Sequence, residues 1–123
     1  MINQYTDSTQ NSVLESLGIK VKDIGDVVVT KGGFAFWKGY RSIPEHDMGR
    51  YSLSAGKLIS LMPRTVFSSS YTMTFFIEPY TDGKSWRVGY KTENGIRNDS
   101  VLGDDLVGCL VRLLVKLKRE ELL

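Results

Sequence analysis

Cysteine and histidine are almost absent from the sequence: Cys109 is the single cysteine and His46 the single histidine among 123 residues. One thiol cannot form a disulfide within the chain, and one thiol with one imidazole is too little for a zinc site built from several such ligands. We therefore expect no disulfide framework, no metal site and no cofactor, and we expect a reducing compartment.

Long apolar runs are absent as well. No stretch of the sequence reaches the roughly 18 consecutive apolar residues that a membrane-spanning helix needs. Residues 1–16 are polar and lack the basic segment followed by an apolar run that marks a secretory signal. The sequence thus predicts a cytoplasmic protein with no membrane partner.

Charge of one sign is also missing, since 16 basic and 14 acidic residues leave a net charge of +2. Gross charge therefore gives no support to a polyanionic partner such as nucleic acid. Apolar residues make up 41% of the chain and charged residues 24%, which is ordinary for a globular protein. We expect a polar segment with a short helix over residues 1–18, frayed up to residue 11, and a single domain over residues 19–123.

Two short helices are indicated by capping patterns. Ser12 and Glu15 have the spacing of a capping box, ahead of a helix that Gly18 can end. Further along, apolar residues recur at helical spacing between Ser54, which can cap a helix, and Pro63, which stops one. The apolar residues of this second helix are Ala55, Leu58, Ile59 and Met62.

Strand signals precede the second helix. Residues 27–30 and 34–40 are β-branched or aromatic and flank a pair of glycines, which predicts a hairpin. Phe34 and Phe36 are two positions apart, so we expect both in the core, on one face of the second strand. Residues 43–50 combine a proline, a glycine and several charges, and we expect a loop there.

Alternation of apolar and polar residues predicts an antiparallel sheet in the second half of the chain. Residues 71–77 and 86–91 both alternate with a period of two, and residues 81–84 have the composition of a turn between them. Asn94-Gly95 is the strongest two-residue hairpin signal in the sequence. A third strand is therefore expected near residues 96–100.

The clearest helix pattern covers residues 104–120. Asp104 and Asp105 suit the positive end of the helix dipole, and basic residues gather at the opposite end. One stripe of this helix, fit to pack on a sheet, consists of Leu106, Leu110, Leu113 and Leu117. The expected fold class is α+β, with a mainly antiparallel sheet packed against this long C-terminal amphipathic helix and a short helix before the sheet.

A second apolar stripe lies beside the leucines and consists of Val107, Val111 and Val115. The combined apolar arc is wider than packing on one sheet requires. Two explanations are open: the N-terminal half of the chain covers the valines, which we favour, or the valines form the interface of a homodimer.

The segment 51–122 carries a recurrent pattern. Leu61-Met62-Pro63 ends a helix ahead of two strands with Tyr and Trp residues and an amphipathic last helix, and in this the segment resembles short uncharacterised proteins of bacterial prophages and mobile elements. Ile77-Glu78-Pro79 with Asp82-Gly83, then Gly103-Asp104-Asp105-Leu106 opening a helix, is similar to the core of HicB-type antitoxins. This resemblance implies a three-stranded sheet with one helix, a partial ribonuclease H fold, and a protein that neutralises a small ribonuclease toxin by direct binding.

Aromatic and basic residues are mixed at the end of the predicted hairpin, at Trp37, Lys38, Tyr40 and Arg41. Such mixtures are typical of protein contact surfaces. The alternative is structural: the rings rim the core and the two cations are solvated. These four residues are the first candidate binding group.

The last helix has a narrow polar face formed by Arg112, Lys116 and Arg119. These cations could contact a phosphate or an acidic partner, although a position near the helix C-terminus already explains two of them. They are the second candidate binding group.

No catalytic centre is predicted. We expect His46 to be a solvated loop residue and Cys109 to be a small buried one, and the carboxylates are spread over caps and turns. The sequence therefore favours a small non-enzymatic protein-binding protein of phage or mobile-element type. The alternatives are a nucleic-acid-binding accessory protein and an antitoxin-like inhibitor of a ribonuclease toxin.

Overall fold

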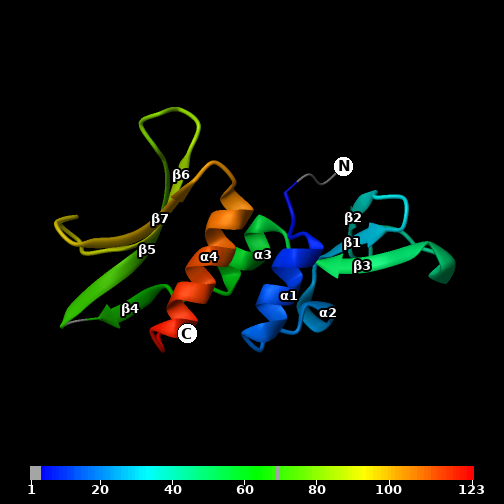
Figure 1. Cartoon of the computed structure of the whole chain (residues 1–123), viewed down its shortest axis with the longest axis horizontal. Coiled ribbons are helices and arrows are strands. Elements are labelled where there is room, and N and C mark those ends of the chain that lie inside the picture. The colour runs from blue at the N-terminus through cyan, green and yellow to red at the C-terminus, as the bar shows by residue number, and fades with distance from the viewer. Residues whose placement is uncertain (1–3, 69) are drawn as a thin grey trace. The chain divides into compact units, whose positions relative to one another are not determined.

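A computed structural model describes residues 4–68 and 70–123 (Figure 1). Its contacts divide the chain into two compact units, residues 1–58 and residues 59–123, and each is described by itself. Both units combine helices with an antiparallel sheet, so the α+β fold class is confirmed. The single domain expected over residues 19–123 stays a prediction.

The first unit begins with helix α1, Ser8–Ser16. Its cap is Asp7, which accepts a hydrogen bond from the Gln10 amide at 2.7 Å, while the Asp7 amide donates to the Gln10 side chain at 2.9 Å. This is a capping box, but it lies five residues before the predicted one at Ser12, so the predicted helix start is wrong. Gly18 follows the helix with a φ of +86°, a conformation that suits glycine, and the predicted helix end is confirmed.

The residues ahead of α1 are tied to the rest of the first unit. Thr6 is buried, and its amide donates to the Leu53 carbonyl at 3.0 Å while its hydroxyl accepts from the Leu53 amide at 3.0 Å. The Asn11 amide group donates to the Tyr51 carbonyl at 3.1 Å. Of the segment predicted to fray, residues 5–11 are therefore held by specific hydrogen bonds, because their polar side chains satisfy buried backbone groups.

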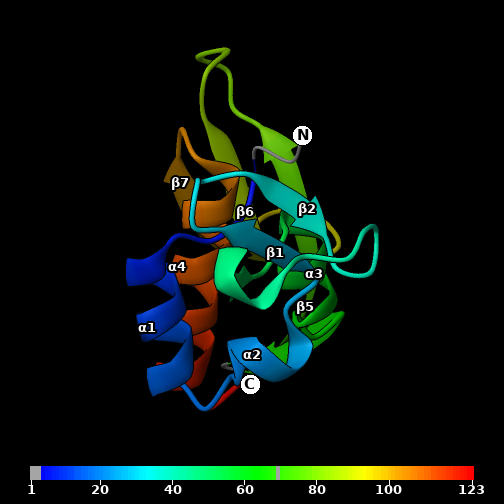
Figure 2. The ribbon, with the colours of Figure 1, turned by 90° about the vertical axis from the view of Figure 1, so that its right-hand side faces the viewer.

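A three-stranded antiparallel sheet follows the short helix α2, Val21–Ile24 (Figure 2). The strands are β1, Val27–Thr30, β2, Ala35–Trp37, and β3, Met48–Ser52, in the order β2-β1-β3. The predicted hairpin is confirmed as β1 and β2. The predicted loop is wrong in part, because its residues form the 3₁₀ turn Glu45–Asp47 and then enter β3.

The strand β2 buries a different residue from the predicted ones. Ala35 lies opposite Val29, on the face that holds the buried core of this sheet, whereas Phe34 is exposed and Phe36 is half-buried. The prediction that both phenylalanines belong to the core is therefore wrong. The run Phe-Ala-Phe-Trp has apolar residues on both faces, so its alternation does not say which face is buried.

Helix α3, Ala55–Ser60, confirms the second predicted helix. The Ser54 hydroxyl accepts from the Lys57 amide at 3.1 Å, as expected of the capping residue, and donates to the Asp26 carboxylate at 2.5 Å. The Asp26 carboxylate also accepts from the Ser54 amide at 2.8 Å, so the start of α3 is anchored beside β1.

The second unit contains a four-stranded antiparallel sheet in the order β4-β5-β6-β7. Its strands are β4, Thr65–Ser68, β5, Tyr71–Pro79, β6, Trp86–Lys91, and β7, Asn98–Gly103. The three predicted strands are confirmed as β5, β6 and β7, and β4 was not predicted. The loop at Asn94-Gly95 is longer than the two residues predicted. The backbone pair that closes it is Thr92 and Arg97, because the Thr92 amide donates to the Arg97 carbonyl at 2.9 Å.

Helix α4, Leu106–Arg119, packs against β6 and β7 and confirms the predicted C-terminal helix (Figure 1). Its cap is Asp105, whose carboxylate accepts from the Gly108 amide at 3.1 Å. In the single chain, Val107 and Val111 have only 2% and 4% of their surface exposed, and Val115 is half-buried. No helix in the described part of the chain is long and apolar enough to cross a membrane.

Candidate binding surfaces

The first predicted group lies on β2 and the turn that follows it. Trp37, Lys38, Tyr40 and Arg41 are all exposed. Gly39, with a φ of +84°, lets the chain turn back so that the Tyr40 amide donates to the Trp37 carbonyl at 3.0 Å. The turn is therefore a defined structure.

The two faces of the first sheet divide this group. The Trp37 position is opposite Val27, on the core face but at the edge strand, where its ring stays exposed. Phe36 is opposite Val28 on the other face, and Val28 in turn is opposite Tyr51 of β3. The candidate group was defined by nearness in the sequence. Alternation along the strand places the Trp37 side chain on the opposite face of the sheet from the adjacent Phe36.

Two cation–π contacts fix the basic members of the group. The Arg41 guanidinium lies 5.2 Å from the centre of the Phe36 ring, and the Lys38 ammonium lies 5.4 Å from the centre of the Tyr51 ring. Neither cation forms an ion pair with a carboxylate of the described residues. Lys38 and Arg41 are thus held in place by aromatic rings while their charge stays uncompensated.

Exposed aromatic rings lie on β2 and directly before and after it. Phe34, Trp37 and Tyr40 have 55%, 51% and 73% of their surface exposed. We call Phe34, Trp37, Lys38, Tyr40 and Arg41 the β2 surface. Phe34 was missed as a surface residue, because the run Phe-Ala-Phe-Trp has apolar residues on both faces.

The second predicted group lies on α4, and two of its three cations attach the helix to β7. Arg112 donates to the Leu102 carbonyl at 3.0 Å and to the Cys109 sulfur at 3.4 Å, and Lys116 forms an ion pair with Asp99. Arg119 is exposed in the last turn. Arg112 and Lys116 therefore have a structural explanation, whereas Arg119 forms no ion pair with a carboxylate of the described residues.

The single histidine and the single cysteine lie in the environments predicted for them. His46 has a side chain 81% exposed, 3.7 Å from the Asp47 carboxylate. Cys109 is buried, and burial raises the pKa of its thiol, while Arg112 acts in the opposite direction. Among the described residues, no three His, Cys, Asp or Glu side chains gather as they would around a metal ion.

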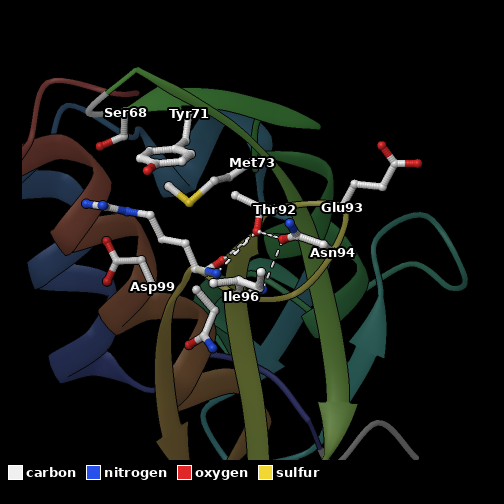
Figure 3. A pocket seen from close by; sticks show the side chains of 10 residues that line it. Ser68, Tyr71, Met73, Thr92, Glu93, Asn94, Ile96 and Asp99 are labelled. Carbon is white, nitrogen blue, oxygen red and sulfur yellow. Dashed lines mark hydrogen bonds between the residues drawn. The ribbon is translucent and has the colours of Figure 1, made fainter.

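A cleft that the sequence did not reveal opens in the second unit, between the adjoining ends of β4 and β5 and the β6–β7 loop (Figure 3). Its volume is about 1270 Å³. Its lining includes Tyr71, Met73, Thr92, Ile96, Arg97 and Asp99. Tyr71 and Arg97 are far apart in the sequence and are brought together by the pairing of β5, β6 and β7, so no local pattern could indicate the cleft.

The sequence matches no protein-family model and no curated protein, and the structure matches no solved structure.

Proposed function

We propose that this chain is a non-enzymatic binding protein that holds a protein partner on the β2 surface. The observation that carries the proposal is the exposure of Phe34, Trp37 and Tyr40, each more than half exposed on one short strand and its flanking turns. Exposing three large rings to solvent within seven residues is costly unless a partner covers them, and such exposed apolar surface marks interaction sites.

The composition of the β2 surface fits a protein partner better than a small ligand. Tryptophan, tyrosine and arginine are the residues that contribute most to binding at protein interfaces. Trp37 lies on an edge strand, where a partner can approach it from the side as well as from the front. The rings supply the buried area, and Lys38 and Arg41 supply charges at the rim.

The test is capture of a partner by the tagged full chain, comparing wild type with Trp37→Ala and Tyr40→Ala. We expect both variants to melt near the wild-type temperature, because their rings are exposed, and to lose the partner. Tyr80→Ala is the matched control, since Tyr80 is an exposed aromatic residue of the second unit, in the β5–β6 loop. Capture that survives both β2 substitutions would overturn the proposal.

Nucleic acid is the alternative partner, and the uncompensated charges of Lys38 and Arg41 favour it. The salt dependence of the binding affinity distinguishes a nucleic-acid partner from a protein partner. Binding through phosphates releases counterions, so its affinity falls steeply between about 50 and 200 mM salt. A protein partner held by aromatic rings should stay bound over the same range.

The resemblance to prophage proteins and to HicB-type antitoxins supplies a specific candidate for the protein partner, namely a small ribonuclease toxin. The order β5, β6, β7, α4 agrees with the element order expected from that resemblance, with β4 added at the edge of the sheet. A toxin of this kind would be recognised by co-purification with the chain and by loss of its ribonuclease activity in the complex.

A homodimer through Val107, Val111 and Val115 is not part of the proposal. The first two valines have almost no surface left for a second copy in the single chain.

A further inference from the structure

The cleft of the second unit contains an arginine whose charge has no partner. The Arg97 guanidinium lies 4.8 Å from the centre of the Tyr71 ring, and Arg97 is exposed. It forms no ion pair with a carboxylate of the described residues. The ring holds one side of the guanidinium, which leaves its N–H groups free for a ligand.

The two carboxylates near Arg97 do not neutralise it. Asp99 is in an ion pair with Lys116, and the Glu93 side chain points away from the cleft in Figure 3. The Arg97 guanidinium is therefore a cation without an ion pair beside the Tyr71 ring, and charge complementarity to this group selects an anionic group.

The loop that forms one wall of the cleft is fixed by its own hydrogen bonds (Figure 3). The Thr92 hydroxyl and the Asn94 side-chain oxygen are 2.8 Å apart, the Arg97 amide donates to the Thr92 hydroxyl at 3.2 Å, and the Ile96 amide donates to the Asn94 side chain at 3.1 Å. This network holds Ile96 at the rim with 84% of its surface exposed. Binding to a loop already ordered costs little conformational entropy.

The geometry points to a second binding site, which takes a peptide segment with a carboxylate next to an aliphatic side chain. The carboxylate pairs with the Arg97 guanidinium, and the aliphatic side chain packs on Tyr71 and Ile96. The volume of about 1270 Å³ exceeds the roughly 300–1,000 Å³ of typical small-molecule pockets, which favours an extended peptide. This site is separate from the β2 surface and does not depend on its role.

The test is a selection of displayed random heptapeptides on the immobilised full chain, with the Arg97→Gln variant as the parallel target. We expect peptides enriched on wild type to contain Asp or Glu beside Leu, Ile or Val. The best peptide, synthesised with a fluorophore, is then titrated in two forms, as selected and with each acid replaced by its amide. Loss of a charge-assisted bidentate pair should weaken binding by about tenfold or more.

Two variants give the matched comparison in that titration. Arg97→Gln and Ile96→Ser should each weaken binding of the acidic peptide, while Arg119→Gln, which removes an exposed arginine from α4, should leave it unchanged. Circular dichroism verifies that all three are folded. Four outcomes would overturn the inference. Two concern affinity: the acid and amide peptides bind equally well, or Arg97→Gln and Arg119→Gln weaken peptide binding by the same factor. The other two are that no peptide is selected, or that a labelled oligouridine binds more tightly than the peptide.

Discussion

Tyr90 shows how one side chain links two parts of the second unit. Its ring is buried and lies 5.6 Å from the ring of Phe75, and its hydroxyl donates to the Pro63 carbonyl at 2.7 Å. The hydrogen bond satisfies a carbonyl just after the last turn of α3, and burial raises the pKa of Tyr90 to about 12. Both facts lead to measurable consequences.

Tyr90→Phe should lower the free energy of unfolding by about 1 kcal/mol at neutral pH, because it removes a single buried hydrogen bond and keeps the ring. Urea denaturation gives the value, and Tyr80→Phe, at an exposed tyrosine, should change little. A group whose folded pKa is raised stabilises the fold below its ordinary pKa of 10.0, and that stability is lost as the pH rises toward about 12. The difference between wild type and Tyr90→Phe should therefore shrink across this range; a constant difference would contradict the burial of the hydroxyl.

Residue patterns predicted exposure well where the environment of a side chain is local. His46 lies in a turn and is exposed as expected. Trp37, for which a contact surface and a place at the rim of the core were both open, is exposed at an edge strand. Phe34 was misplaced because an apolar residue on a short edge strand has no local signal for its face. The pairing of Arg97 with Tyr71 depends on strand register, which single residues do not encode.

At the scale of elements, the N-terminal cap of α4 depends on Asp105 and Gly108. Asp105 accepts from the Gly108 amide, and a Cβ at residue 108 would lie 2.8 Å from the Asp105 carboxylate, so glycine allows the carboxylate its close approach. Asp104 is exposed and is not the capping residue. Asp105 forms the capping bond, and both aspartates place negative charge near the start of the helix. Substituting each in turn therefore distinguishes the contribution of the capping bond from that of the charge.

Asp105→Ala should lower the free energy of unfolding by about 1 kcal/mol, because the amide of Gly108 loses its acceptor. Asp104→Ala should cost only a few tenths of that, from the weaker interaction with the helix dipole. Chemical denaturation monitored by far-UV circular dichroism measures both. If the two variants lose equal stability, the capping bond contributes nothing beyond charge.

Elements with a clear periodic or capping pattern could be predicted from the sequence, and β3 and β4, which lack such a pattern, could not. The helix α4 has many apolar residues in phase, so it was predicted nearly to its ends. The strand β4 buries only Val66, and β3 lies in a stretch with Gly49 and Arg50 that has the composition of a loop. Both are strands because a neighbouring strand pairs with them, which is a tertiary cause.

At the scale of the whole molecule, the valine stripe of α4 decides between a self-sufficient chain and an obligate dimer. Both Val107 and Val111 are buried in the single chain. A carboxylate introduced there would lose its hydration without gaining a partner. The free energy of unfolding and the mass in solution, measured for the wild type and for a variant with a carboxylate at this position, therefore distinguish the two arrangements.

Val111→Glu should lower the free energy of unfolding by about 3 kcal/mol or more, the range for an unpaired charge in a core. Lys118→Glu, which places the same group on the exposed side of α4, should have little effect. Light scattering should show a monomeric wild type. A dimeric wild type together with a well-folded, monomeric Val111→Glu variant would show that the valines form an interface.

The hydrogen bond from Arg112 to the Leu102 carbonyl has a consequence for colloidal behaviour. β7 is the outermost strand of its sheet, and an outermost strand with vacant carbonyls is a template on which strands of other molecules can assemble. The Arg112 guanidinium, which is held on α4, donates a hydrogen bond to the carbonyl of Leu102 in β7. An incoming strand would have to displace that guanidinium before it could pair with Leu102.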